Sequence, residues 1–240
     1  MTKYSIIIPC HNEEKIIYKI LEDLNDINYK KENYEIIVVD NASTDKTCIK
    51  IWEFLYKKKI KNLKIIHENT KGVSIARNSG ADNTIGEYCI FLDADNRVDK
   101  EFLNNIDKKF VKNVVGASIK TIPFDGDKII YLCFWIIDLI KRFSGRAFGK
   151  SVISRKVLNI IGKFNENIVL GENVEIFIRL KKYCKKNKKK IEYINTPIFC
   201  SSRRFFKENK FKLLYSWLIA YLGKFNLKYK TIKELEEFEN

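Results

Sequence analysis

Residues 87–97 have the sequence EYCIFLDADNR, and this stretch decides the fold. Residues 88–92 form a short apolar run, which is typical of a strand buried on both faces in a parallel sheet. The run ends abruptly in Asp93-Ala94-Asp95. Residues i and i+2 of a strand point to the same side, so the two carboxylates are expected to converge where open α/β sheets bind ligands.

Two converging carboxylates repel each other unless a positive group lies between them. Oxygen ligands suit Mg²⁺ or Mn²⁺, and such ions are usually shared with substrate phosphates. Asp95 and Asp93 are therefore candidate ligands of Mn²⁺ or Mg²⁺. An isolated Asp-x-Asp sequence is more often a solvated acidic turn, and it is the apolar strand before it that favours a site.

The first half of the chain alternates predicted strands with predicted helices. Strands are predicted at residues 4–9, 34–39, 63–67 and 88–92, and helices over 12–27, from Ser43 or Thr44 to Leu55, and 72–81. This order implies a parallel sheet with right-handed crossovers. The second half is less regular, with helices predicted over 100–111, 129–143, 172–186 and 211–222, and strands over 114–122, 148–153 and 191–194.

Composition limits the class of protein. The hydrophobic content of 45% excludes a disordered chain. The six cysteines are scattered, without a C-x-x-C motif, which is typical of reduced, mostly buried cysteines in a cytoplasmic protein and not of a disulfide framework or a zinc site. We expect no signal peptide, and the longest apolar stretch, residues 129–140, is too short to span a bilayer.

The charge is unevenly placed. Residues 1–140 hold as many acidic as basic residues, so the net charge of +15 falls entirely in residues 141–240. We expect an anionic partner there: acidic lipid, a phosphate-bearing acceptor or nucleic acid. Residues 205–221 are unusually aromatic, and they either pack in the core or contact an anionic membrane at its inner face.

Three further loops follow predicted strands. The first, PCHNEE at residues 9–14, lacks G-x-G-x-x-G, which disfavours a dinucleotide-binding Rossmann domain. Asp40 either accepts a hydrogen bond from a base or ribose or starts the next helix as an Asx-turn. In residues 69–78, Gly72 permits close backbone approach, and Arg77 either offsets a diphosphate or forms an internal ion pair with Asp40 or Asp93.

Four stretches together carry a family resemblance: YSIIIPCHNEE (4–14), EIIVVDNASTDKT (35–47), NTKGVSIARNSGA (69–81) and GEYCIFLDADNRVDKEFL (86–103). In this order and spacing they resemble the family 2 glycosyltransferases of GT-A fold. The resemblance implies an α/β, GT-A-type nucleotide-binding sandwich with a mostly parallel central sheet flanked by helices. It implies a single domain over 1–225, made of a nucleotide-sugar-binding half (1–110) and an acceptor-side half (111–225), with a charged tail at 226–240.

The resemblance also implies a chemistry. A sugar would pass with inversion from a nucleoside-diphosphate-sugar, UDP- or GDP-linked, to a glycan, lipid-linked or protein acceptor, with a divalent metal at Asp95 and Asp93. Nucleotide-sugar-binding roles carry over to ten positions: Pro9, Asn12, Glu13, Asp40, Lys71, Arg77, Asp93, Ala94, Arg203 and Arg204. For Arg203 and Arg204, a basic surface patch is an equal alternative to a diphosphate-binding loop.

The catalytic base is where the sequence departs from the family pattern. The family usually has an Asp in a Glu-Asp pair at a helix start, and here Asn173 follows Glu172. An amide cannot take a proton from an acceptor hydroxyl. Either Glu172, the first choice by proximity, or Glu175 takes this role, or the match of this stretch to the family pattern is out of register, or the protein is a catalytically impaired nucleotide-sugar-binding protein. A basic nucleic-acid-binding module ranks last, because no recognised motif supports it.

Overall fold

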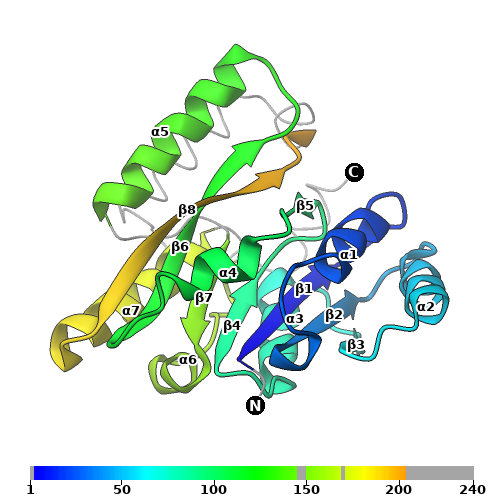
Figure 1. Ribbon diagram of the computed structural model, residues 1–240, viewed down its shortest axis with the longest axis horizontal. Helices are drawn as coiled ribbons and strands as arrows, with labels where there is room; N and C mark the ends of the chain where they lie inside the picture. Colours follow the sequence, from blue (N-terminus) through cyan, green and yellow to red (C-terminus); the bar gives the residue numbers. More distant parts are fainter. Residues whose placement is uncertain (1–2, 145–149, 169–170, 204–240) are drawn as a thin grey trace.

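The computed structural model describes residues 3–144, 150–168 and 171–203. Within them, one eight-stranded sheet forms the centre of the molecule, in the order β3-β2-β1-β4-β7-β6-β8-β5 (Figure 1). The strands are β1 (Tyr4–Cys10), β2 (Tyr34–Asn41), β3 (Leu63–Glu68), β4 (Tyr88–Phe91), β5 (Asn96–Arg97), β6 (Val114–Pro123), β7 (Ser151–Ser154) and β8 (Lys190–Cys200).

Strands β1 to β4 are parallel, as predicted. Successive residues of β1 face opposite cores: Ile6 and Ile8 belong to one apolar cluster, and Ile7 belongs to the other. The first core includes residues of α1 (Ile17–Asn25), α2 (Thr47–Lys58) and α4 (Phe102–Asp107), and the second includes residues of α3 (Val73–Asp82), α6 (Arg155–Ile161) and α7 (Glu172–Asn187). The continuous apolar strands are thus explained by helices on both faces.

The second half extends the same sheet. Strand β7 is antiparallel to both β4 and β6, and β8 runs parallel to β6. Strand β5 pairs antiparallel with the end of β8, with Asn96 opposite Cys200. This last pairing holds residues 201–203 beside the loop that contains Asp95.

Two helices begin later than the apolar pattern predicts. Helix α1 begins at Ile17 and not at Asn12, because Asn12 has a left-handed φ of 54° and its side-chain oxygen accepts a hydrogen bond from the Thr44 N–H at 2.8 Å. Helix α2 begins at Thr47, and the N–H of Thr47 donates a hydrogen bond to Asp45 Oδ1 at 2.8 Å. The cap expected from Ser43 or Thr44 was therefore wrong.

Other differences follow from tertiary contacts. Helix α4 is shorter than predicted, β8 extends to Cys200, and α6 and β5 were not predicted. Helix α5 (Lys128–Ser144) matches its prediction closely. A short 3-10 helix (Lys31–Asn33) precedes β2. Residue 148 of the predicted 148–153 strand and the predicted 211–222 helix lie outside the described residues. Helices long and apolar enough to cross a membrane do not occur in the described part of the chain.

Candidate active site

The loop after β4 holds its two carboxylates in a tight turn. The Asp93 N–H donates to Asn96 Oδ1 at 2.9 Å, and Asn96 Nδ2 donates to Asp95 Oδ1 at 3.0 Å. Asn96 is fully buried, and Ala94 between the acids is buried too. The Asn96 side chain therefore fixes where both carboxylates point, at the carboxyl end of β4 as predicted.

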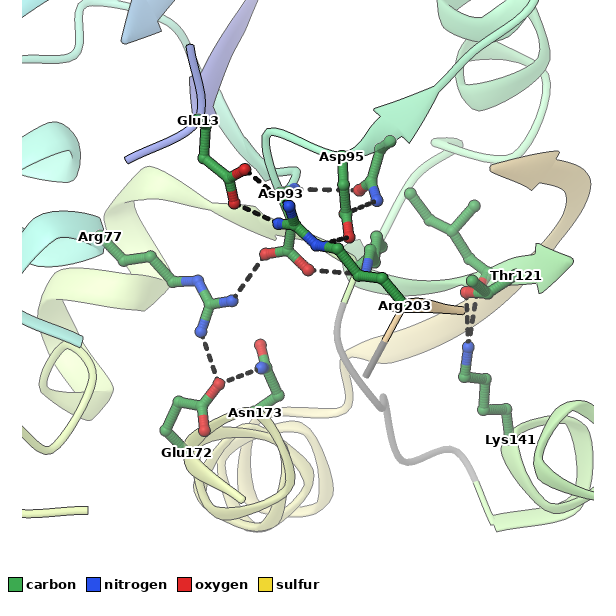
Figure 2. A network of polar contacts seen from close by, with 12 residues as sticks. Glu13, Arg77, Asp93, Asp95, Thr121, Lys141, Glu172, Asn173 and Arg203 are labelled. Carbon is green, nitrogen blue, oxygen red and sulfur yellow. Dashed lines mark hydrogen bonds and ion pairs between the residues drawn. The ribbon is translucent and has the colours of Figure 1, made fainter. Parts of the chain in front are cut away.

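Three cations surround these carboxylates (Figure 2). On Asp93, Oδ1 lies 3.1 Å from Arg77 Nη2, and Oδ2 lies 2.6 Å from Lys150 Nζ. Arg203 approaches Asp95 Oδ2 at 3.7 Å through Nε and forms a two-pronged ion pair with Glu13, with one contact of 2.8 Å. Residues distant in sequence thus converge on one point, at the carboxyl ends of β1 and β4.

The electrostatics of this cluster follow from burial and crowding. Burial raises the pKa of Asp95, Lys150 and Arg203 act against this effect, and the carboxylates of Asp93 and Glu13 add to it. Burial alone would lower the pKa of Lys150, but the adjacent Asp93 outweighs this effect and raises it. The balance of these effects leaves the pKa of Asp95 above its ordinary value, and the main cause is burial.

Arg77 connects this cluster to the first turn of α7. Its Nη1 lies 2.6 Å from Glu172 Oε1, and the side chain is only 4% exposed. Burial alone would lower the pKa of Arg77, but the charges of Glu172 and Asp93 raise it. The sequence allowed Arg77 to pair with Asp40 or Asp93; the structure pairs it with Asp93 and Glu172.

Asn173 completes this corner. Its Nδ2 donates to Glu172 Oε1 at 2.5 Å, while its Oδ1 is buried without a hydrogen-bond partner among the described contacts. In the view of Figure 2, that oxygen is turned toward the space between Arg77 and Arg203. A buried acceptor that lacks a donor is energetically costly, so Asn173 Oδ1 is the unusual atom of this corner.

Glu175 has a different setting. Both of its carboxylate oxygens are bound by Arg179, at 2.6 Å each. Arg179 also donates to the backbone carbonyls of Ile161 and Lys163, which tie α7 to the end of α6. Glu175 thus orients Arg179, which links α7 to α6, whereas Glu172 is linked through Arg77 to the carboxylate cluster.

Four of the residues predicted to bind the nucleotide lie at or just after the ends of β1 and β2. Asn12 and Glu13 bind the loop before α2, the Glu13 N–H donating to Thr47 Oγ1 at 2.7 Å, and Pro9 lies in β1 opposite Val39. Asp40 is buried; one oxygen has no recorded partner, and the other lies 3.5 Å from His67 Nδ1. The Asx-turn alternative for Asp40 is not seen, since Asp40 lies within β2.

Lys71 lies exposed in the loop before α3. That loop is held by Asn41, which donates to the Thr70 carbonyl at 2.6 Å and accepts from the Gly72 N–H at 2.8 Å. Gly72 has a φ of 155°, in the range where glycine is favoured. Arg204 lies outside the described residues.

The cysteines are all free and five are buried, as expected. Cys48, which is only partly buried, lies with its Sγ 4.0 Å from His67 Nε2, and both side chains are close to Asp40. The strands and helices bring together residues that no short spacing connects.

Sequence reasoning missed Lys150 and the anchors Asn96 and Asn41. Lys150 has no motif around it, and it reaches Asp93 only because β7 pairs with β4. The role of Asn96 could have been predicted, because an Asn directly after Asp-x-Asp can form a side-chain hydrogen bond to the backbone of the preceding turn.

Comparisons with known proteins agree with this geometry. Residues 5–214 match the model of "Glycosyl transferase family 2". A dolichyl N-acetyl-α-D-glucosaminyl phosphate 3-β-D-2,3-diacetamido-2,3-dideoxy-β-D-glucuronosyltransferase of Methanococcus voltae is 41% identical over 105 residues, 44% of this chain and 33% of that protein. Glycosyltransferase AglE of Haloferax volcanii is 30% identical over 179 residues, 71% of this chain and 58% of that protein.

Two solved structures share the fold. The mannosyltransferase PcManGT of Pyrobaculum calidifontis, in complex with GDP-Man and Mn²⁺, superposes with a TM-score of 0.70 at 17% identity, covering 92% of this chain and 70% of that one. Staphylococcus aureus TarS 1-349 in complex with UDP superposes with a TM-score of 0.68 at 22% identity, covering 100% and 78%. The sheet and its helices are those of GT-A proteins, and the chain belongs to glycosyl transferase family 2.

Proposed function

We propose that this chain transfers a sugar from a nucleoside-diphosphate-sugar to an acceptor hydroxyl, with inversion at the anomeric carbon. The observation that carries the proposal is the convergence of Glu13, Asp93 and Asp95 with Arg77, Lys150 and Arg203 at the carboxyl ends of β1 and β4. Cations around a crowded carboxylate site suit a diphosphate and its metal.

The donor is proposed to be UDP- or GDP-linked. One structural neighbour is a complex with GDP-Man and Mn²⁺, and another is a complex with UDP. Asp40 would receive the base, since its buried carboxylate oxygen lacks a recorded donor. Pro9, Asn12, Lys71 and Ala94 would line the same pocket.

A divalent metal, Mn²⁺ or Mg²⁺, fits the residues present. Asp95 is a partly buried carboxylate whose pKa is raised, mainly by burial, so a hard cation held by Asp95 and Asp93 would favour its charged form. When bound, the metal would neutralise the developing charge of the diphosphate leaving group. Arg203, which pairs with Glu13 in this structure, would donate to the diphosphate.

The transfer step assigns a role to Glu172. The acceptor oxygen attacks the anomeric carbon, its hydroxyl proton passes to Glu172, and the bond from the anomeric carbon to the diphosphate oxygen breaks. The recorded contacts of Glu172 all use Oε1, which leaves Oε2 to take the proton. Asn173 Oδ1 would accept a hydrogen bond from a substrate hydroxyl nearby.

The acceptor is proposed to be a glycan or a lipid-linked sugar. The Methanococcus voltae relative is named for transfer to a dolichyl-phosphate-linked N-acetylglucosamine. This chain spans 33% of that relative's length, so the acceptor class is inferred from the matched part alone.

Thermal stabilisation tests the donor site. UDP, GDP, CMP and their sugar conjugates are added with and without Mn²⁺ to the wild type, to Asp95→Asn and to Asp99→Asn, an exposed acid four residues away that serves as the matched control. A ligand that binds the native state raises its apparent stability. We expect one nucleotide to stabilise the wild type and Asp99→Asn in a metal-dependent way, and Asp95→Asn to lose the effect. The absence of any shift would refute the donor site.

A further inference from the structure

Helix α5 exposes a stripe of large apolar side chains. Leu132, Trp135, Leu139 and Phe143 follow one another at helical spacing, with exposures from 38% at Leu139 to 85% at Phe143. The full set of exposed large apolar residues on this helix is Ile129, Tyr131, Leu132, Trp135, Ile136, Leu139 and Phe143. A contiguous exposed apolar face of this kind marks an interaction surface.

The other side of α5 packs on the sheet. Ile130 and Cys133 are buried, and Lys141 Nζ donates to the Ile119 carbonyl at 3.1 Å and to Thr121 Oγ1 at 2.9 Å, both in β6. These contacts fix the rotation of the helix. The apolar stripe faces outward because the opposite side of the helix packs against β6. Figure 1 shows α5 at the margin of the molecule, far from α2.

The fully exposed charged residues of α5 are all basic. Its one acidic residue, Asp138, is only partly exposed, and both carboxylate oxygens accept from the Tyr193 hydroxyl of β8 at 2.6 Å. The exposed charged residues of the helix, Lys128 and Arg142, are both cations and lie near its two ends. The net charge of +15 also belongs to residues 141–240.

We propose that α5 docks on a lipid bilayer that contains anionic lipids, with its axis in the plane of the interface. An amphipathic helix binds in this way by burying its apolar side chains at the boundary between headgroups and acyl chains, while basic residues attract anionic headgroups. Trp135 and Tyr131 are side-chain types that favour this interface. A second copy of the chain is a poorer partner, because a symmetric dimer through α5 would bring Lys128 and Arg142 of both copies together without an exposed acidic residue of the helix to pair with them.

Docking by α5 would place the bilayer beside the proposed active site. Asp125, just before α5, accepts from the Ser202 N–H at 2.5 Å, and the next residue, Arg203, pairs with Glu13. The membrane proposal stands on α5 alone and does not depend on transfer activity, so the two can fail separately.

Vesicle sedimentation with the full chain tests the proposal. The probes are vesicles of equal parts phosphatidylcholine and phosphatidylglycerol, compared with pure phosphatidylcholine. The variant is Leu132→Glu/Trp135→Glu in α5, and the matched control is Ile49→Glu/Tyr56→Glu in α2, where two apolar residues are 55% and 85% exposed. We expect the wild type and the α2 variant to bind anionic vesicles, and the α5 variant to bind at least tenfold more weakly.

Trp135 gives a second measurement without removing the apolar face. In Trp52→Phe/Trp217→Phe, Trp135 is the one remaining tryptophan, and its emission should shift to the blue with anionic vesicles and be quenched by brominated lipids. Failure of the wild type to bind, an equal loss in the α2 variant, or unchanged Trp135 emission would each overturn the proposal.

Two other outcomes would identify a different occupant. Dimers of the wild type that dissociate in the α5 variant, seen by light scattering, would indicate a second copy. A large fall in the urea midpoint of the α5 variant alone would indicate that residues of the same chain cover the stripe. Either result would also overturn membrane docking.

Discussion

Arg77 Nη1 lies 2.6 Å from Glu172 Oε1 and joins α3 to the first turn of α7 across a sequence separation of 95 residues. Both side chains are at most 10% exposed. The same guanidinium reaches Asp93 at 3.1 Å through Nη2. The proposed base and the proposed metal loop are therefore held by one cation.

Breaking this pair should destabilise the fold. Arg77→Met leaves the buried carboxylate of Glu172 without its cation, while Asp93 keeps its ion pair with Lys150, and the expected loss in the free energy of unfolding is about 3 kcal/mol. Urea denaturation measures it. In a double-mutant cycle with Glu172→Gln, the pair should lose clearly less than the sum of the two single changes; strict additivity would show that the contact contributes nothing.

Turnover should identify the base. Removing a general base costs on the order of 10² to 10⁴ in rate, so we expect Glu172→Gln to lower kcat at least a hundredfold, with release of the nucleoside diphosphate as the measurement. Glu175→Gln is the control from the same helix and should affect stability more than the chemical step, since Glu175 binds Arg179.

Asn173→Asp supplies the complementary test. If Glu172 is the base, an added carboxylate beside it should change kcat less than about tenfold, well under the general-base contribution. A large gain in Asn173→Asp over a nearly inactive wild type would instead show that the amide had replaced the base. The buried oxygen of Asn173 would then mark where the lost carboxylate acted.

Lys150 should control the pH at which metal binds. The charge of Lys150 counteracts the burial that raises the pKa of Asp95, so Lys150→Met should raise that pKa further. Metal ligation needs the deprotonated carboxylate, and the midpoint of Mn²⁺-dependent nucleotide stabilisation should therefore move to higher pH. Lys156→Met, an exposed lysine on α6, should leave the midpoint unchanged. A shared midpoint in all three proteins would contradict the role of Lys150.

Lys141 should make stability depend on alkaline pH. Burial, aided by Lys150, lowers its pKa from 10.5 to about 8. Between these two values the unfolded chain holds the proton and the folded chain does not, so this residue's contribution to the free energy of unfolding rises with pH, by up to about 1.4 kcal/mol per unit. Lys141→Met should lack this rise, and urea unfolding at pH 7.5 and pH 10 compares the two proteins. If the free energy of unfolding changed equally with pH in the wild type and in Lys141→Met, Lys141 would not be the group responsible.

The parts predicted well from sequence depend on local patterns. The apolar runs at β1, β2 and β4 identified buried parallel strands, and Asp93 and Asp95 followed from the end of one run. The helix starts at Asn12 and Ser43 were mispredicted, because the two loops bond to each other through Asn12 and Thr44. A single sequence does not display such contacts between loops.

The missing parts of the site depend on strand pairing. Lys150 reaches Asp93 through the antiparallel pairing of β7 with β4, and Arg203 reaches Asp95 through the pairing of β5 with β8. Neither pairing has a local signal: β5 has two residues, and β8 was predicted at less than half of its length. Glu172 as the catalytic base stays a prediction, and its ion pair with Arg77 was not predicted.

The continuity of the sheet limits how the molecule can open. The nucleotide-side strands and the acceptor-side strands are hydrogen-bonded neighbours, with β4 next to β7. In the described part of the chain the two halves are thus joined by strand pairing, and Ser151, next to Lys150, lies opposite Phe91, two residues before Asp93. A withdrawal of the Arg203 side chain from Glu13 and Asp95 would be a local displacement that opens access to Asp95 and leaves this strand pairing in place.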